Sequence, residues 1–331
     1  MSANPQVREA DQTQSIDAMD AEMREVDAVI RRRLTSEVAL VDQIARYITS
    51  AGGKRIRPLL VLLFSGALGF KGAERFELAA SVEFIHTATL LHDDVVDESG
   101  LRRGRETSNA VFGNAASVLV GDFIYSRAFQ MMVSVNQMRV LQVLSDATNV
   151  IAEGEVLQLM NMHDADLHVS DYLKVIRYKT AKLFEASARL GAVLANSPPE
   201  VEEACADYGR SLGTAYQLVD DLLDYEGSTS ELGKNVGDDL REGKPTLPLL
   251  IAMERGDPDE RALIRKAIQD GEVERLADVI AIVRRTGALD ATREAAREET
   301  MQAQRSLAVL ENSVHKEALL KLCQRSLERS A

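Results

Sequence analysis

The chain has 331 residues, of which 45% are hydrophobic and 27% are charged, and its formal net charge is −13. A chain of this length can bury a large core, and the acidic balance excludes general nucleic-acid binding, because a phosphate backbone needs clustered Lys and Arg. The two cysteines, Cys205 and Cys323, form no CxxC motif, so we expect small buried side chains in a reducing compartment and no disulfide framework.

The N-terminal stretch is polar and lacks the apolar core of a signal peptide. The longest apolar stretch, Pro58 to Phe70, is shorter than the roughly 20 residues that span a bilayer. We therefore expect a soluble, cytoplasmic protein with no stable membrane anchor. No long Pro/Gly/Ser-rich linker divides the chain, so we expect a flexible segment at residues 1–15 and one all-α domain over residues 16–331.

Helical periodicity dominates the chain, and convincing runs of strand-like alternation are absent. In chain order, the predicted helices cover residues 16–32, 35–50, a segment from Pro58, 73–98, 115–135, 138–163, 170–195, 200–225, a segment from near Thr246, and several amphipathic helices over 258–329. The pattern predicts an all-α, single-domain bundle of roughly a dozen helices around a central apolar cavity.

Two acidic clusters stand at the ends of long apolar helices, and each reads Asp-Asp-x-x-Asp. Their members are Asp93, Asp94 and Asp97 in the first cluster, and Asp220, Asp221 and Asp224 in the second. Positions i and i+4 share a helix face, so the first and third aspartates of each cluster should point the same way and repel each other. Two copies of such a costly arrangement indicate a function. We expect the bundle to bring both clusters to one mouth.

Carboxylates without several His or Cys ligands favour a hard cation, for which Mg²⁺ is the natural choice. Magnesium usually takes one or two carboxylates together with phosphate oxygens, so two facing clusters would hold two or three ions around one diphosphate. The helices that lead to both clusters are apolar, so the organic part of the substrate should be apolar too. An apolar tail on a diphosphate head describes an isoprenoid diphosphate.

The same segments carry a resemblance to a known family. The chain resembles the trans-isoprenyl diphosphate synthases, or polyprenyl synthetases, over nearly its whole length from about residue 20, and most closely their medium- and long-chain members. The resemblance rests on GGKRIRP (52–58), EFIHTATLLHDDVVDESGLRRGRET (83–107), the Lys179-Thr180 pair, YQLVDDLLDYEG (216–227) and GKNVGDDLREGKPTLPLL (233–250). It implies the isoprenoid synthase fold, a homodimer, and repeated condensation of isopentenyl diphosphate with an allylic diphosphate, expected to be farnesyl diphosphate.

The resemblance also implies a role for each matching position. Asp93 and Asp97, assisted by Asp94, correspond to the first magnesium site, and Asp220, supported by Asp221 and Asp224, to the second. The positions that correspond to isopentenyl diphosphate contacts are Lys54, Arg57, His86 and Arg103. Those that correspond to allylic diphosphate contacts or to the polar lining near the developing cation are Arg102, Lys179, Thr180, Gln217, Lys234 and Lys244. Basic side chains suit these roles because they give phosphates charge-assisted hydrogen bonds.

From the sequence itself, interpretations without a role in substrate binding stay open for these residues. Arg102 and Arg103 could form a solvated helix end, and Lys54 and Arg57 a charged turn. A lone histidine on an apolar helix, such as His86, is usually a satisfied core residue. The loop at 227–245 could be an ordinary connector, although its lysines favour a closing lid.

Product length is expected to depend on Ala88, which lies five residues before Asp93 and therefore about 7.5 Å down the helix, and on its neighbour Thr89. Both side chains are small, so a growing tail can pass. Deeper stops are Phe84 or the Met131-Met132 pair, or these are plain core residues. The resemblance implies a product near C40, with C45 as the main competitor, which would supply the side chain of a respiratory quinone.

Three other functions match parts of this pattern less well. A class I terpene cyclase usually carries Asn/Asp, Ser/Thr and Glu in its second metal motif, where this chain has DDLLD. A metal phosphohydrolase could use His92-Asp93, but it needs further spaced His and Asp ligands, and this chain has only five His. A non-catalytic helical subunit would be expected to have lost carboxylates, and all six are present.

Overall fold

The computed structural model describes residues 5–50, 52–226, 237–271 and 274–328 of the chain. These residues are helical throughout apart from turns and one short hairpin, β1 (Leu101–Arg102) and β2 (Arg105–Glu106), whose strands pair antiparallel. The helices are α1 (Pro5–Arg33), α2 (Ala39–Ser50), α3 (Ile56–Ala67), α4 (Glu74–Val96), α5 (Ser108–Phe112), α6 (Asn114–Ser134), α7 (Met138–Asn161), α8 (Val169–Ile176), η1 (Arg177–Ala181), α9 (Lys182–Leu194), α10 (Pro199–Glu226), α12 (Asp238–Arg241), α13 (Leu247–Arg255), α14 (Pro258–Asp270), α15 (Leu276–Arg285), α16 (Ala288–Ser306), η2 (Leu307–Val309) and α17 (Val314–Leu327). The predicted all-α fold is confirmed.

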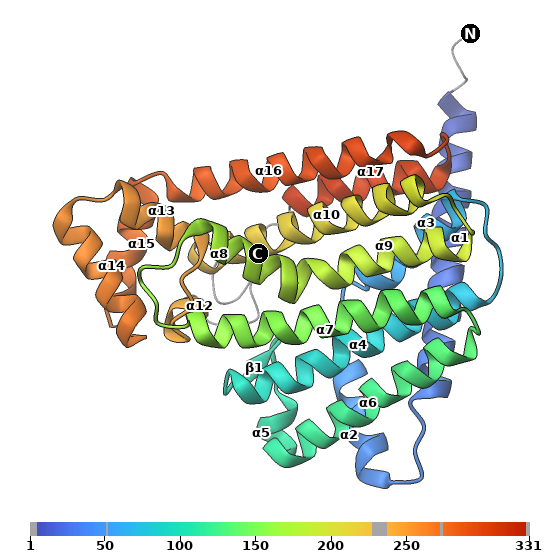
Figure 1. Ribbon diagram of the computed structural model, residues 1–331, viewed down its shortest axis with the longest axis horizontal. Helices are drawn as coiled ribbons and strands as arrows, with labels where there is room; N and C mark the ends of the chain where they lie inside the picture. The colour runs from blue at the N-terminus through green and yellow to red at the C-terminus, as the bar shows by residue number, and fades with distance from the viewer. Residues whose placement is uncertain (1–4, 51, 227–236, 272–273, 329–331) are drawn as a thin grey trace.

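The long helices lie in layers, as Figure 1 shows, from α16 and α17 at the top through α10 and α9 to α7, α4 and α6 below. Helix α9 packs against both α3 and α10, and α4 packs against α3 and α6. Buried apolar side chains form one core around α4, α6 and α7, a second from α10 to α16, and a third between α3, α9 and α17. These cores fix the ends of α4 and α10, where the acidic clusters lie.

Residues with positive φ shape the chain before α3 and after α4. Arg55 has a left-handed φ of 49° at the start of α3, three residues after Gly52, whose φ is 70°. Beyond α4, Arg103 and Gly104 both have positive φ, 53° and 72°. They form a two-residue turn of the kind whose twist suits a tight hairpin. The hairpin therefore directs two consecutive arginines, Arg102 and Arg103, back towards α4.

The structure differs from the sequence prediction at three elements. Helix α1 begins at Pro5 instead of residue 16, and the intervening sequence contains no Gly or Pro that would stop it. The segment predicted as one helix over 170–195 is divided by η1, a π-helical stretch. The hairpin at 101–106 was missed because strands of two residues carry no periodic signal. The flexibility of residues 1–15 stays a prediction.

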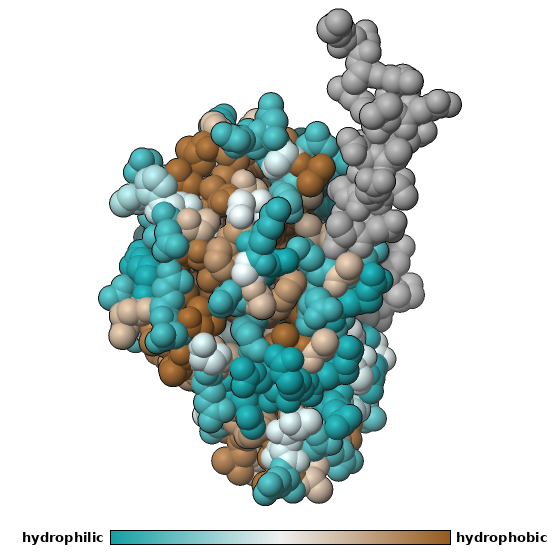
Figure 2. All heavy atoms as spheres, turned by 90° about the vertical axis from the view of Figure 1, so that its right-hand side faces the viewer, coloured by the Kyte–Doolittle hydropathy of each residue, from teal (hydrophilic) through white to brown (hydrophobic). Residues whose placement is uncertain are grey.

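The surface is mixed in character. On the face shown in Figure 2, hydrophilic residues cover most of the area and hydrophobic residues form several smaller patches. Within the described part of the chain, no helix combines the length and hydropathy needed to cross a membrane.

Candidate active site

A cleft of about 900 Å³ opens where the ends of α4 and α10 meet the hairpin, α7, η1 and the segment before α13. Most of the residues singled out from the sequence line it. They are Lys54, Arg57, His86, Thr89, Asp93, Asp97, Arg102, Arg103, Lys179, Thr180, Gln217, Asp220, Asp221 and Lys244. Its apolar walls include Ile56, Leu90, Ile176 and Phe184. Lys234 lies outside the described residues. Segments more than a hundred residues apart in the sequence thus share one mouth.

The first acidic cluster presents two of its carboxylates to the cleft. Asp93 lies in the last turn of α4 and Asp97 caps that helix, so the two share one side of its end. Lys244 Nζ lies 3.1 Å from Asp97 Oδ2, and Lys179 Nζ lies 3.8 Å from Asp93 Oδ2. Burial raises the pKa of Asp93 and the nearby Lys179 only partly opposes that effect. Positive charge is therefore drawn to this wall.

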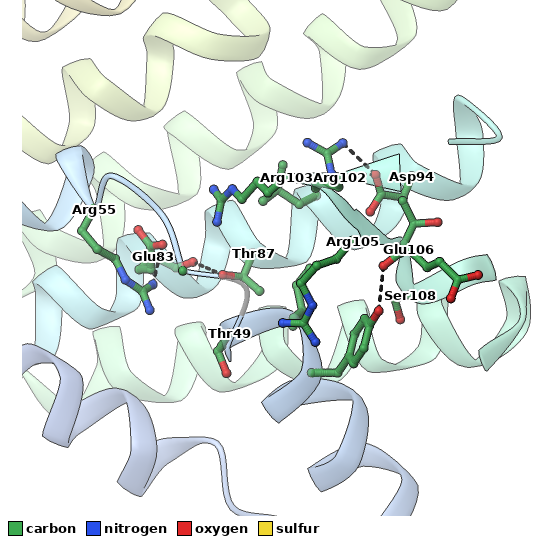
Figure 3. A pocket seen from close by; sticks show the side chains of 15 residues that line it. Thr49, Arg55, Glu83, Thr87, Asp94, Arg102, Arg103, Arg105, Glu106 and Ser108 are labelled. Carbon is green, nitrogen blue, oxygen red and sulfur yellow. Dashed lines mark hydrogen bonds and ion pairs between the residues drawn. The ribbon is translucent and has the colours of Figure 1, made fainter. Parts of the chain in front are cut away.

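Asp94 is turned away from the cleft. Its side chain is fully buried, and Oδ1 accepts hydrogen bonds from Arg102 Nε and Nη2, each at 2.7 Å. Asn109 Nδ2 donates to the Asp94 carbonyl oxygen at 3.0 Å. Figure 3 shows Asp94 beside Arg102, in a small polar pocket next to the cleft. Asp94 thus ties the hairpin to α4, and a direct catalytic role for it stays a prediction.

The second acidic cluster is arranged differently from the first. Asp220 and Asp221 line the cleft, and Asp221 accepts hydrogen bonds from Tyr172 Oη at 2.5 Å and from Gln217 Nε2 at 2.7 Å. Burial, followed by the proximity of Asp239, raises the pKa of Asp221 to about 8. Both of these hydrogen-bond partners are neutral, whereas the partner of Asp94 is the cation Arg102.

Asp224 does not line the cleft, although it shares a helix face with Asp220. It is fully buried. The start of α12 covers it: the backbone N–H of Asp239 donates to Asp224 Oδ2, and that of Gly237 to the Asp224 carbonyl, each at 3.2 Å. The expectation that all six aspartates converge on one mouth is therefore too broad, because four of them reach the cleft and two are held behind its walls.

The donor set fits a cation that is shared with a ligand. Among the described residues, no three His, Cys, Asp or Glu side chains are close enough to hold a metal ion by themselves. Magnesium does not need such a cage, because it takes one or two carboxylates and completes its shell with phosphate oxygens and water. Asp93 and Asp97 on one wall and Asp220 on the other offer that arrangement. The lysines beside Asp93 and Asp97 mark where positive charge is favourable.

A further part of the cleft lining is a cationic wall. Arg57 is half-buried, with its guanidinium 4.5 Å from the centre of the Phe184 ring, and burial, partly offset by Glu83, lowers its pKa to about 10. Burial and the surrounding arginines, Arg57 first, hold the pKa of His86 well below its usual value. His86 is therefore neutral at pH 7 and can donate a hydrogen bond without adding charge. Arg57, Arg103 and Lys54 supply the positive charge of this wall.

The π-helical stretch η1 directs Lys179 and Thr180 into the cleft. Lys179 Nζ lies 2.6 Å from Glu155 Oε2, and Thr180 Oγ1 donates to Gln217 Oε1 at 3.0 Å. Gly154 lets α7 approach closely, because a Cβ there would lie 2.6 Å from the Lys179 backbone nitrogen. Such π-helical turns are frequent at functional sites.

Among the cleft residues that the sequence analysis did not single out are Glu155 and Tyr172. Glu155 pairs with Lys179, and burial raises its pKa to about 6 although Lys179 opposes that shift. Tyr172 lies seven residues before Lys179 and bonds Asp221. The local signal for Glu155 was its spacing of three residues from Gln158, which puts both on one face of α7. Tyr172 had no local signal, because its partner is 49 residues away.

Of the two residues predicted to set product length, only Thr89 lines the cleft. Its Oγ1 donates to the His86 carbonyl at 2.9 Å. Ala88 is fully buried in the core that also contains Phe84, Met131 and Met132. A bulky side chain at Thr89 would meet the cleft directly, whereas one at Ala88 would first have to displace core side chains.

Comparison with known proteins gives a consistent result. The polyprenyl synthetase family model matches residues 38–284. The chain is 54% identical to octaprenyl diphosphate synthase from Escherichia coli over 93% of this chain and 96% of that protein. It is 46% identical to an all-trans-nonaprenyl-diphosphate synthase (geranyl-diphosphate specific) from Rhodobacter capsulatus, over 92% of this chain and 94% of the relative. A Caulobacter crescentus polyprenyl synthase, crystallised with calcium and isoprenyl diphosphate, superposes with a TM-score of 0.93 and 45% identity, and covers 97% of this chain and 98% of its own.

Proposed function

The chain belongs to the polyprenyl synthetase family and is a long-chain trans-prenyltransferase, and on that basis we propose that it extends farnesyl diphosphate with isopentenyl diphosphate to an octaprenyl (C40) product. One observation carries the proposal: the carboxylates Asp93, Asp97 and Asp220 and the cationic wall line a single cleft. Such a site can hold one diphosphate through metal ions and a second through basic side chains. The octaprenyl diphosphate synthase at 54% identity supports the product length.

Asp93, Asp97 and Asp220 would hold two or three Mg²⁺ ions together with the allylic diphosphate. When bound, the ions neutralise the diphosphate and make it a better leaving group. The related Caulobacter structure, with calcium and isoprenyl diphosphate, supports a divalent cation at this kind of site. Lys179 and Lys244, now beside the carboxylates, can turn towards the diphosphate oxygens, and Arg102 is held by Asp94 at the same edge.

The second substrate, isopentenyl diphosphate, would lie on the cationic wall. Lys54, Arg57 and Arg103 would bind its diphosphate by charge-assisted hydrogen bonds. Neutral His86 would donate one more. This wall and the carboxylates Asp93, Asp97 and Asp220 line the same cleft, so the two organic tails can be held in contact.

The reaction then follows from charge. The allylic C–O bond breaks and the diphosphate leaves with the electron pair. The carbonyl oxygen of Gln217 and the hydroxyl of Thr180 present partial negative charge to the developing cation. The double bond of isopentenyl diphosphate attacks, a C–C bond forms, and the released diphosphate takes the proton. Closing the cleft would exclude water, which would otherwise capture the cation.

Incubation of the purified protein with Mg²⁺, farnesyl diphosphate and isopentenyl diphosphate tests the proposal, with product mass as the readout. A C40 product is expected. A C45 product is the second candidate, which the nonaprenyl-diphosphate synthase relative favours, and geranyl diphosphate should be compared as the starter for the same reason. No condensation with either starter would refute the proposal.

Product length offers a second test. We expect Thr89→Phe to shorten the product, because this position lines the cleft. Ala88→Phe tests the original prediction for the buried neighbour. If both variants make the wild-type product, neither residue sets chain length.

We also propose a homodimer. Helices α6 and α7 are neighbours and carry exposed apolar side chains. These are Leu119, Val133, Met138, Val156, Leu159 and Met160. A second copy would remove them from water. Light scattering coupled to size-exclusion chromatography should give a mass of twice 36.4 kDa, and a monomer would contradict this proposal while leaving the activity assignment untouched.

A further inference from the structure

A buried carboxylate, Glu83, lies within the cationic wall. It is on α4, one turn before His86, and is only 7% exposed. Its Oε1 lies 2.5 Å from Arg55 Nη1, and its backbone carbonyl accepts a hydrogen bond from Thr87 Oγ1 at 2.8 Å. Figure 3 shows Glu83 between Arg55 and the guanidinium of Arg103. A negative charge here is unexpected, because by itself it would repel a diphosphate.

Glu83 serves more than one cation. For both Arg57 and Arg103, burial lowers the pKa, and Glu83 is the foremost charge that opposes the shift. Arg103 also lies so close to Gly53 that a Cβ there would be 2.8 Å from its Nη1. The guanidinium groups are thus crowded together before any anion arrives. Like charges at close range repel each other, so these side chains would move apart or towards water without Glu83.

Arg55 connects this charge to the backbone. Its left-handed φ of 49° is uncommon for a residue with a side chain. The ion pair with Glu83 holds that conformation and turns Arg55 towards α4. Lys54 before it and Arg57, in the first turn of α3, also line the cleft. Segment 52–57 and these two cations are therefore held in place through Arg55.

We propose that Glu83 is a positioning residue for isopentenyl diphosphate: it holds segment 52–57 in place through Arg55, and it compensates the charge of Arg57 and Arg103 until the diphosphate of the substrate does so. This inference rests on the proposed function, which assigns the cationic wall to isopentenyl diphosphate. Glu83 acts through the arginines. The proposal predicts that removing the negative charge of Glu83 weakens the binding of isopentenyl diphosphate. Simple electrostatics predicts the opposite, because removal of a negative charge would tighten anion binding.

The experiment compares Glu83→Gln with wild type in steady-state kinetics with Mg²⁺, farnesyl diphosphate and isopentenyl diphosphate. The KM for isopentenyl diphosphate should rise about tenfold or more, as small misplacements of binding groups cause, while the KM for farnesyl diphosphate stays unchanged. Glu83→Asp keeps the charge and should recover most of the loss. Glu77→Gln is the matched control, because Glu77 is on the same helix and pairs with Arg32 and Arg33, away from the cleft. It should behave as wild type.

Several outcomes overturn the inference: a KM for isopentenyl diphosphate that falls or stays constant in Glu83→Gln, an equal rise for both substrates, or no recovery in Glu83→Asp. If Glu83→Gln does not fold, Arg55→Met removes the same ion pair from the other side. This variant should also raise the KM for isopentenyl diphosphate. An unchanged KM in Arg55→Met would overturn the inference as well. Wild-type enzyme that is inactive with these substrates would refute the proposed function instead. In that case, calorimetric titration of isopentenyl diphosphate into wild type and into Glu83→Gln tests the positioning role alone. We expect weaker binding to the variant. Equal or tighter binding would overturn the positioning role.

Discussion

The two acidic clusters have the same sequence pattern and very different surroundings. In the first, Asp93 and Asp97 face the cleft near the ammonium groups of Lys179 and Lys244, and Asp94 is paired with Arg102. In the second, Asp221 is bonded to neutral side chains and Asp224 to backbone amides. The first cluster is thus built to exchange cations at its surface. The second is held rigidly by hydrogen bonds, with Asp220 and Asp221 as its face towards the cleft.

The largest expected effect tests the first cluster. Asp93→Ala should lower kcat by on the order of a thousandfold, because it removes a group that acts on the charge developing in the reaction. Turnover at several Mg²⁺ concentrations measures this loss, and the far-ultraviolet circular dichroism spectrum should keep its helical shape. Near-normal activity with an intact spectrum would remove Asp93 from the metal site.

Tyr172→Phe tests the rigidity of the second cluster. Without the hydroxyl, one oxygen of buried Asp221 loses its donor, so we expect a free energy of unfolding lower by about 1–3 kcal/mol. We also expect kcat to fall about tenfold, because Asp221 is no longer held in one orientation. Urea unfolding and steady-state kinetics measure the two effects. Tyr125→Phe, on α6, is the control, and a Tyr172→Phe enzyme with wild-type kcat would contradict the positioning of Asp221.

Asp224→Asn should separate structure from chemistry most clearly. Asp224 is fully buried beneath the start of α12, so the variant should lower the free energy of unfolding by about 1–3 kcal/mol while kcat falls only about threefold. Thermal unfolding and turnover at a temperature well below the transition measure this. Loss of activity comparable to that of Asp93→Ala, in a stably folded variant, would make the two clusters functionally alike.

The smallest effect concerns pH and Glu155. Its raised pKa of about 6 means that Glu155 carries a proton below that pH and is ionised above it, where it can pair with Lys179. At pH 7.5 we expect the kcat/KM for the allylic substrate to be a few-fold higher in wild type than in Glu155→Gln. Towards pH 5 the two values should converge, because one pH unit below the pKa only about a tenth of the Glu155 carboxyl is ionised. Glu153→Gln, exposed on the same helix, should follow wild type. Parallel profiles for Glu155→Gln and wild type would rule out Glu155 as the source of this pH dependence.

The sequence predicted the fold and the first cluster well, because both depend on local rules. Helical periodicity gave most helices, and the spacing of Asp93 and Asp97 at the end of one helix correctly placed both on the cleft. The same rule failed for Asp224, since the segment that covers it comes 13 or more residues later in the chain. Likewise, Tyr172 and Glu83 act through partners that only the folded chain brings together.

The hairpin at 101–106 shows a second limit. Its two-residue strands carry no pattern, yet it determines where Arg102 and Arg103 point. Product length shows a third: counting back from Asp93 identified Ala88, whereas the side chain that reaches the cleft is that of Thr89. The rotation of α4 about its axis decides which of two neighbouring side chains faces the cleft, and counting residues along the sequence does not give that rotation.

The π-helical stretch between α8 and α9 has an evolutionary consequence. A π turn is commonly understood as an α-helix into which one extra residue has been accommodated, and one residue corresponds to about 100° of rotation around a helix axis. Deleting a single residue from Arg177–Ala181 would therefore let α8 and α9 merge into one regular helix, with its upstream and downstream faces out of step. The register of one of the two helices against its neighbours would be lost. Loss or gain of residues in this stretch should be selected against far more strongly than substitutions along the same helices.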